Sequence, residues 1–441
     1  MNISSYEHKN ICNINQVKYK NLYLINNEFY FLTLKNIELP KILTLGGPEH
    51  SNIININQYE LHPKVKIFND QKELDEYVKN LNIIEFNTPT VYFSHYYDHN
   101  VGHGLYDALY PIFFAFLNFN NNTYDEFNIL VNLLFIPRWK FQWNASRDWL
   151  LEIFEKFSKG KLIIRNNIDN LNIYKFSCLI SGSEYCGISS VNKDSVMPGK
   201  EQLMLEKFRD RFYNCYNIVK PIKQSDKLNI LFIDSERFTK EERNTLLNIH
   251  NELIQNGHNS NFISWINYPS FKEQLEIMNN TDIHISCSGT SMMNFVFLND
   301  NKIHINLGTS FYGGSLNLPS LMEINIILCS NNICTKLYDI FKYKKIIYEP
   351  IKLIIQETID SIRNCIFHKT IVPNYIQVWR EYCKLDPNIN TIIQKMNGKI
   401  KPDLIAKRWI DYFVYYNHIY KNENLNINLI NDLKSKYNIQ Y

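Results

Sequence analysis

Leu228–Asp234 (LNILFID) opens the stretch that decides the fold class, because short apolar runs alternate with helical patterns from here to residue 307. The runs FISW (262–265), DIHISC (282–287) and KIHINL (302–307) follow, and each has the length of one buried strand. Between them, residues 241–255, 271–279 and 290–298 carry helical patterns. Strands that alternate with helices of this length predict a parallel, doubly wound α/β sheet.

One edge of this predicted sheet can be located without coordinates. Ligands of doubly wound sheets bind outside the carboxyl ends of the strands. The candidate binding loops are therefore those that begin at Ser235, Ile266, Ser288 and Gly308.

The length of 441 residues exceeds the size of one hydrophobic core, so we expect two domains and an appendage. Pro221 and the polar residues 223–227 indicate a linker. The expected division is an N-terminal α/β domain over 1–220, a Rossmann-like domain over 226–340 and a mostly helical extension over 341–441.

The N-terminal domain is predicted to begin with strands and loops over residues 21–93. Apolar residues then recur every three or four positions over 103–119, which predicts a helix that Pro111 kinks or splits. After this helix we expect strands at 127–136, 162–165 and 173–181, and helices at 145–157 and 201–217.

The bulk composition excludes several classes of protein. A formal net charge of +3 gives no electrostatic footprint for nucleic-acid binding. The nine cysteines include no C-x-x-C pair, which is typical of reduced thiols in a cytosol-like compartment. The N-terminus is polar, and no stretch approaches the ~20 apolar residues of a membrane span. We therefore expect a cytoplasmic protein with neither a membrane span nor a nucleic-acid partner.

Two of the candidate loops carry groups that suit a diphosphate. The loop after residue 234 contains Arg237 and Arg243, and guanidinium groups bind phosphate oxygens bidentately. Ser288-Gly289-Thr290-Ser291 opens a predicted helix, whose free backbone N–H groups form an anion site. Asn294 lies inside that helix, where its amide is unfavourable unless it serves a neighbouring loop or a ligand.

A structural interpretation of the same residues stands beside the functional one. The two arginines would then be solvated charges among nearby glutamates, and the small residues would only permit a tight turn. The convergence of both groups on one sheet edge favours a diphosphate cradle. The glutamates concerned are Glu236, Glu241 and Glu242.

The stretch Asn100-Val101-Gly102-His103, with Asp107 four residues further on, resembles the N-x-G-H-x-x-x-D signature of glycosyltransferase family 61. This family contains protein O-GlcNAc transferases, O-mannose-linked GlcNAc transferases and plant xylan-decorating enzymes. The spacing matches at every fixed position. Pro111 falls one place later than the usual proline of the family.

The second half of the chain contains further resemblances to this family. Arg243 with residues 251–253 resembles its R…N-E-x-L stretch, and Phe271-x-x-Gln274 resembles its F-x-E-Q helix. Residues 288–297 resemble its H-G-A-G-L-T-N-x-x-F segment, although Ser288 replaces a histidine and Ser291 replaces a glycine. The likeness covers about residues 95–310.

The resemblance implies a GT-B-like fold, with two Rossmann-like domains that face a cleft, and an inverting transfer with donor binding in the C-terminal half. No Asp-x-Asp occurs in the chain, although metal-dependent transferases of the other main fold generally use that motif. Charge on the donor must then be neutralised by Arg, Lys and backbone dipoles. We expect no cofactor and no metal, a UDP-sugar as donor, and a hydroxyl of a glycan or glycoprotein as acceptor.

The resemblance also assigns roles to residues. His103 is the candidate base for the acceptor hydroxyl, because histidine is the side chain most often used as a general base, and Asp107 lies one helical turn further on. Asn100 and Gly102 complete the acceptor side. The candidate donor-binding residues are Arg237, Arg243, Gln274, Ser288, Gly289, Thr290, Ser291 and Asn294. In the structural alternative, His103 caps a helix or bonds within the core, and Asp107 only fixes it.

Two other classes of function stay open. His95, His99 and His103 recur every fourth residue near Asp98 and Asp107, a composition that could hold metal in a hydrolase. That site requires one continuous helix over 95–103, whereas residues 91–93 resemble a strand and Gly102 interrupts the run. The other class is a catalytically inactive GT-B domain that acts as a scaffold.

Overall fold

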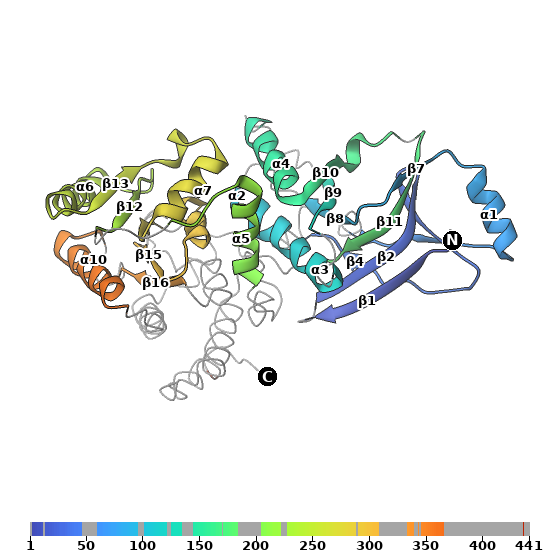
Figure 1. Cartoon of the computed structure of the whole chain (residues 1–441), viewed down its shortest axis with the longest axis horizontal. Coiled ribbons are helices and arrows are strands. Elements are labelled where there is room, and N and C mark those ends of the chain that lie inside the picture. Colours follow the sequence, from blue (N-terminus) through green and yellow to red (C-terminus); the bar gives the residue numbers. More distant parts are fainter. Residues whose placement is uncertain are drawn as a thin grey trace. The chain divides into compact units, whose positions relative to one another are not determined.

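The computed structural model divides into two compact units, Met1–Gly199 and Lys200–Tyr441 (Figure 1). This division falls before α5 (Met204–Tyr216), whereas the sequence analysis places the linker after that helix, near residue 220. The structure describes residues 2–11, 14–45, 60–95, 101–120, 125–134, 144–169, 171–183, 204–221, 227–287, 290–307, 333–338, 343, 345–365 and 435.

The second unit contains the parallel sheet that the sequence predicts. Every strand pair is parallel, and the order is β13-β12-β14-β15-β16. From β12 the chain passes to β13 on one side, and it then returns to form β14 on the other side of β12. A topological switch point therefore lies between β12 and β14. The strands are β12 (Asn229–Ile233), β13 (Asn259–Ile263), β14 (Ile283–Ser286), β15 (Lys302–Asn306) and the unpredicted β16 (Ile333–Leu337).

Helices cover both faces of this sheet. The ring of Phe232 contacts His250 of α6 (Lys240–Gln255), with ring centroids 6.2 Å apart. On the opposite face, Phe295 of η5 (Thr290–Phe297) stacks on His304 at 4.7 Å. The two faces differ because alternate residues of a strand point to opposite sides. This arrangement confirms a mixed α/β fold with a parallel sheet.

The remaining helices of this unit match the predicted positions with one change of type. α7 (Phe271–Asn280) occupies the predicted site, and the side chain of Ser270 accepts a hydrogen bond from the N–H of Glu273. The predicted helix at 290–298 is the 3-10 helix η5, a form that rarely exceeds three or four residues. α10 (Tyr348–Arg363) lies in the predicted helical extension, while residues 366–434 lie outside the described part.

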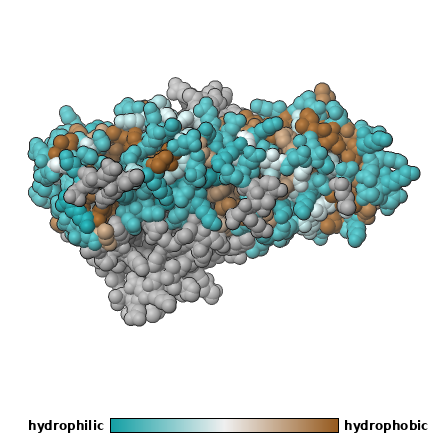
Figure 2. Space-filling model, in the orientation of Figure 1, coloured by the Kyte–Doolittle hydropathy of each residue, from teal (hydrophilic) through white to brown (hydrophobic). Residues whose placement is uncertain are grey.

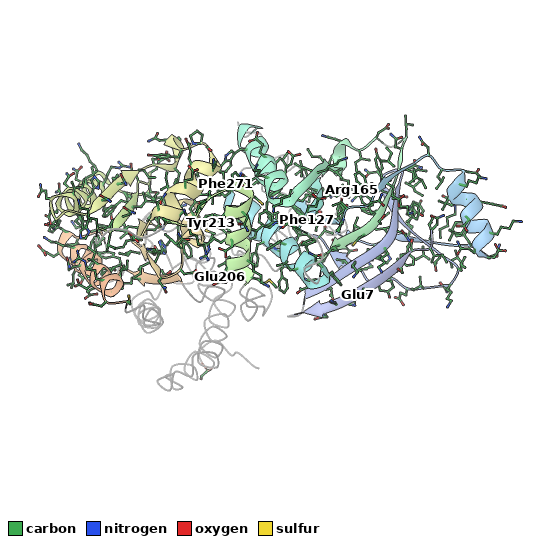
Figure 3. The ribbon with its side chains drawn as sticks, in the orientation of Figure 1. Glu7, Phe127, Arg165, Glu206, Tyr213 and Phe271 are labelled. Carbon is green, nitrogen blue, oxygen red and sulfur yellow. The ribbon has the colours of Figure 1, made fainter. Side chains whose placement is uncertain are left out.

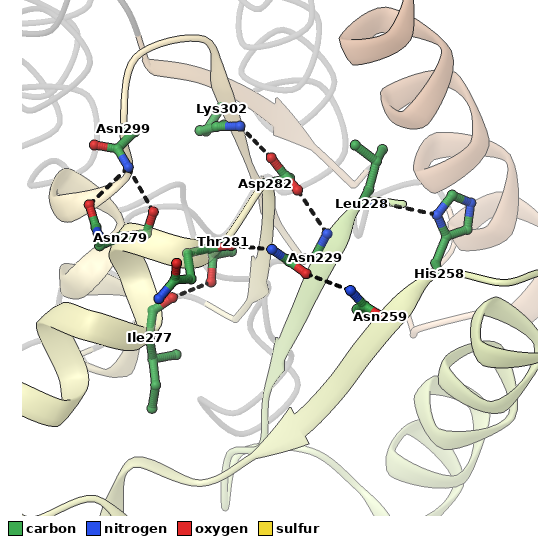
Figure 4. Close-up of polar contacts among 11 residues, drawn as sticks. Leu228, Asn229, His258, Asn259, Ile277, Asn279, Thr281, Asp282, Asn299 and Lys302 are labelled. Atoms are coloured by element: carbon green, nitrogen blue, oxygen red, sulfur yellow. Dashed lines mark hydrogen bonds and ion pairs between the residues drawn. The ribbon is translucent and has the colours of Figure 1, made fainter. Parts of the chain in front are cut away.

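A network of polar side chains closes the amino ends of the strands (Figure 4). Asp282 accepts from the N–H of Asn229 at 2.8 Å and pairs with Lys302. Asn259 donates to Asn229 at 3.0 Å, and Asn229 donates to the Asn280 carbonyl at 2.7 Å. These groups therefore bind the strand starts to one another, at the edge opposite to the one where ligands of such sheets bind.

Helix α5 packs against α7 and η5 through aromatic rings. Phe212 contacts Phe271 at 5.4 Å and Phe297 at 5.5 Å, and the hydroxyl of Tyr213 donates to the Phe297 carbonyl. Figure 3 labels Tyr213 and Phe271 on these neighbouring helices. The buried guanidinium of Arg209 donates to the Leu298 carbonyl at 3.0 Å. These contacts fix the carboxyl end of η5.

The first unit contains a mixed sheet with the order β10-β9-β8-β11-β2-β3-β6. Its parallel part follows the predicted alternation of strands and helices through β8 (Thr90–His95), β9 (Phe127–Leu133), α4 (Asn144–Ser158), β10 (Lys159–Ile164) and β11 (Ile173–Ser181). β2 runs antiparallel to β1, β3 and β11. The sheet therefore departs from the all-parallel arrangement expected of a Rossmann-like domain. The other strands of this sheet are β1 (Ser5–Ile11), β2 (Ile14–Ile25), β3 (Glu28–Thr33), β6 (Lys64–Ile67) and β7 (Ile83–Phe86). β4 (Ile42–Leu43) and β5 (Glu60–Leu61) form a separate antiparallel pair.

One helix interrupts the region predicted as strands and loops. α1 (Gln71–Lys79) begins after Asp70, whose side chain accepts from the N–H of Glu73. Leu74 and Val78 are buried four residues apart, so the helix contacts the core through a narrow stripe. The prediction for residues 21–93 missed this helix, although Leu74, Tyr77 and Val78 recur at helical spacing and Asp70 is a typical N-cap residue.

None of the helices within the described ranges combines the length and the apolar character that a bilayer span requires. On the face shown in Figure 2 the described surface is mainly hydrophilic, with separate hydrophobic areas.

Two buried histidines lie side by side in the second sheet. His284 of β14 pairs in register with His304 of β15, their Nδ1 atoms are 3.0 Å apart, and both side chains are fully buried. Nδ1 of His304 also lies 3.2 Å from the His284 carbonyl. A carbonyl oxygen can only accept, so Nδ1 of His304 carries the proton, and Nδ1 of His284 is an acceptor. Burial, and secondarily the neighbouring His304, hold the pKa of His284 well below 6.5.

We expect the protein to lose stability in mild acid because of His284. The folded state keeps this imidazole neutral, whereas the unfolded chain takes up a proton below about pH 6.5. The free energy of unfolding should therefore be unaffected by this group above that pH and fall below it, by up to about 1.4 kcal/mol per pH unit. Urea unfolding at pH 7.5 and 5.0 measures this. His284→Leu should reduce the difference, and parallel losses in both proteins would contradict the account.

Candidate active site

The candidate catalytic pair lies in the first unit, in the helical segment that follows β8 in the chain. His103 ends α2 (Val101–His103), and Asp107 lies in the π-helix η2 (Gly104–Leu109). Nδ1 of His103 is 2.5 Å from Oδ2 of Asp107. The side chains are 17% and 4% exposed, so the carboxylate is buried while the ring retains access to solvent. The structure thus brings together the two residues predicted to act as base and support.

The chemistry of the pair follows from which ring nitrogen contacts Asp107. When Nδ1–H of His103 donates to the carboxylate, the lone pair of the neutral ring is on Nε2. Nε2 is then the atom that can accept a proton, and the carboxylate stabilises the imidazolium that results. A pair in this arrangement can act as an oriented general base.

Pro111 explains the unusual helix that carries Asp107. It has no N–H, so it cannot satisfy the carbonyl of Asp107 four residues earlier. The chain widens instead into a π-turn, in which the N–H of Tyr110 donates to the Leu105 carbonyl, and α3 (Tyr110–Asn120) continues from there. The predicted kink or split is therefore a π-segment, a form that often occurs at functional sites.

Gly104, which the sequence analysis did not single out, lies where η2 packs closely against α4. A Cβ on Gly104 would lie 2.4 Å from Cδ2 of Leu150 in α4. Leu150 is buried, so it has little freedom to move away. The absence of a side chain at Gly104 therefore permits close packing of η2 against α4. Gly102, which the sequence did indicate, is also buried.

Further polar side chains lie at the carboxyl ends of the neighbouring strands. Ser94 of β8 is 2.7 Å from Thr44 and accepts from Asn132 of β9 at 3.4 Å. Ser181, the last residue of β11, donates to the Tyr92 carbonyl at 2.8 Å. The sequence did not indicate these residues, since single polar residues within strands carry no spacing signal.

The geometry required for the metal site is not met by His95. His95 is the last residue of β8 and its ring contacts Phe154 at 5.8 Å, whereas His103 belongs to α2. The two residues therefore do not share one helix. His99 and Asp98 lie outside the described residues, and no cluster of three metal-binding side chains occurs within them.

In the second unit, Arg237 lies in the loop after β12, and Arg243 lies in the first turn of α6. Arg243 donates from Nε to Oδ1 of Asp234 at 2.8 Å and from Nη2 to the Ser235 carbonyl at 3.1 Å. The side chain of Arg243 is 36% exposed. Arg237 is partly exposed, and its N–H donates to the Ser235 hydroxyl at 3.2 Å. The structure thus places both residues at the carboxyl edge of β12.

The predicted donor-binding residues Gln274 and Asn294 contact each other. The amide of Asn294 donates to Oε1 of Gln274 at 3.0 Å, and Gln274 donates to the Tyr268 carbonyl at 2.8 Å. Both side chains are buried, at 7% and 5% exposure. The Asn294 amide therefore contacts a helix and not the neighbouring loop that the sequence analysis considered, and the pair links α7 to η5.

The other predicted donor-binding residues are described only in part or lie outside the described residues. Thr290 and Ser291 begin η5, but only their backbone is described. Ser288 and Gly289 lie outside, as does Asn100 on the acceptor side.

Glu252, in the N-E-x-L stretch that resembles the family, has a structural contact. It pairs with Lys352 of α10 at 2.8 Å and accepts from the hydroxyl of Tyr348. This stretch therefore joins α6 to α10.

No protein-family model matches the chain, and no curated protein matches it significantly.

Proposed function

We propose that this protein is a glycosyltransferase that moves a sugar from a nucleoside diphosphate donor to a hydroxyl of a glycan or glycoprotein. The observation that carries the proposal is the 2.5 Å contact between His103 and Asp107 directly after β8. An acceptor hydroxyl must lose its proton as it attacks the sugar, and an oriented imidazole can accept that proton. The residues that resemble glycosyltransferase family 61 include this pair.

The second unit supports the donor side of the proposal. Arg237 and Arg243 lie at the carboxyl edge of a parallel sheet beside its switch point, where such sheets bind nucleotides. Guanidinium groups neutralise the charge of a diphosphate leaving group without a metal ion. A UDP-sugar is the donor that we propose, and the GT-B arrangement implied by the family resemblance is part of the proposal.

The proposed reaction is a single displacement with inversion. Nε2 of His103 takes the proton of the acceptor hydroxyl, and the oxygen forms a bond to the anomeric carbon. The bond between that carbon and the diphosphate oxygen breaks, and its electron pair leaves with the nucleoside diphosphate. Asp107 stabilises the imidazolium, and the two arginines stabilise the leaving group.

Binding of nucleoside diphosphates, measured by thermal shift together with the metal content of the purified protein, tests this proposal. We expect UDP to raise the unfolding temperature of the metal-free protein, because a ligand that binds only the folded state stabilises it. Stoichiometric zinc would instead support a metal-dependent hydrolase. Binding without donor hydrolysis or transfer would support an inactive scaffold.

A further inference from the structure

An acidic residue in the loop between β12 and α6 fixes the position of Arg243. Asp234 follows directly after β12, and its backbone N–H donates to the Ile263 carbonyl of β13 at 2.6 Å. Its Oδ1 accepts from the N–H of Ser235 at 2.9 Å and from Nε of Arg243 at 2.8 Å. The carboxylate is therefore held by the backbone of this edge, and it in turn holds the guanidinium.

Arg243 is held from a second direction as well. Its Nη2 donates to the Ser235 carbonyl at 3.1 Å, and the N–H of Phe238 donates to the same carbonyl. Within the part of the chain that the structure describes, Nη1 makes no hydrogen bond with protein. Because the side chain is 36% exposed, an anion in solution can reach the guanidinium.

The start of α6 is rigid, which keeps this arrangement in place. Thr239 and Glu242 form a capping box, in which each side chain accepts from the backbone N–H of the other residue. Glu242 is buried and also accepts from the N–H of Ile346 at 3.2 Å. A guanidinium that is fixed before the ligand arrives loses less conformational freedom when it binds.

We propose that Asp234 is a positioning residue, which orients Arg243 to bind a phosphate group of the nucleoside diphosphate. The inference rests on the proposed function and extends it to a residue whose charge alone would suggest the opposite, because a carboxylate repels phosphate. Asp234 acts through Arg243 and does not contact the ligand.

A double-mutant cycle with UDP as the probe, measured by isothermal titration calorimetry, tests this inference. Asp234→Ala should weaken UDP binding by about tenfold, which corresponds to one charge-assisted hydrogen bond. Asp234→Asn retains an oxygen in place of Oδ1 and should keep most of the affinity. The variant Asp234→Ala/Arg243→Ala should bind UDP no more weakly than Arg243→Ala alone, because the effect of Asp234 passes through Arg243.

The outcomes separate this inference from the proposed function. If Asp234→Ala leaves UDP affinity unchanged, or weakens it equally with and without Arg243, Asp234 does not position Arg243 and the inference is overturned alone. If the wild-type protein binds no UDP, the proposed function and the inference fail together. Thermal unfolding shows whether each variant is folded, and Asp234→Ser takes the place of the alanine variant in the cycle if that variant does not fold.

Discussion

His103→Ala is expected to lower the rate of sugar transfer by about a thousandfold, the scale of a lost general base. The affinity for the nucleoside diphosphate should stay nearly unchanged, because the proposed donor residues Arg237 and Arg243 belong to the other unit. Single-turnover transfer rates and UDP titrations measure the two effects separately. Loss of UDP binding in this variant would show that the roles assigned to the two units are wrong.

Asp107→Asn provides the matched variant, because it keeps the size of a buried side chain and changes its charge and its hydrogen bonding. An amide N–H facing Nδ1 makes that nitrogen the acceptor, so the proton moves to Nε2, where the base is needed. We expect a loss of about a hundredfold or more in transfer rate with little change in the unfolding temperature. A fully active Asp107→Asn variant would favour the alternative in which the pair only stabilises the helix.

Arg209→Ala is expected to lower the free energy of unfolding of the second unit by about 3 kcal/mol. The side chain is 2% exposed, and its removal leaves the buried Leu298 carbonyl without its donor. The carboxylates of Asp210 and Asp300 are 45% and 43% exposed, so solvent screens them and they contribute little to this figure. Urea unfolding followed by tryptophan fluorescence measures the change.

Two further variants separate the contributions of Arg209. Arg209→Met retains most of the volume and loses the hydrogen bonds, so it should recover part of the stability. Asp210→Asn should cost less than about 1 kcal/mol, because the carboxylate is exposed. If Arg209→Ala unfolds at the same urea concentration as the wild-type protein, the contact between α5 and the end of η5 does not stabilise the fold.

The second unit could be predicted well because its strands are buried on both faces. β12 appears in the sequence as an apolar run, whereas in β14 and β15 isoleucines alternate with polar residues, most of which are also buried. All three lie between helical patterns, which is typical of a parallel sheet. The edge strand β13 was predicted at 262–265 but spans Asn259–Ile263. It pairs with a neighbouring strand, β12, on one side only, and its first residues are polar. These residues therefore do not indicate a strand.

The first unit was harder to predict because its strands pair across large distances in the sequence. β2 pairs with β11, and Tyr19 is in register with Leu179. Nothing in either segment specifies its partner or the direction of pairing, since both depend on the packing of the whole sheet. The antiparallel strands at the start of the chain therefore could not be distinguished from a Rossmann-like arrangement.

The contact between His103 and Asp107 was predictable from the sequence, whereas the contacts of the proposed donor-side residues were not. The spacing of His103 and Asp107 specified their contact, because residues four apart share one helix face. The partners of Arg243 and Asn294 could not be deduced, since Asp234 and Gln274 lie on separate elements that only the fold brings close. The sequence shows which polar side chains are present, but their partners depend on how the fold places separate elements.

The central claim is sugar transfer from a nucleoside diphosphate donor, and mass spectrometry of a donor screen tests it most directly. The purified protein is incubated with a panel of UDP-sugars and other nucleotide sugars, together with glycan and glycopeptide acceptors. We predict release of the nucleoside diphosphate from one donor, a product heavier than its acceptor by one sugar, and loss of both signals in His103→Ala. An intact panel of donors after incubation with folded wild-type protein would contradict the account.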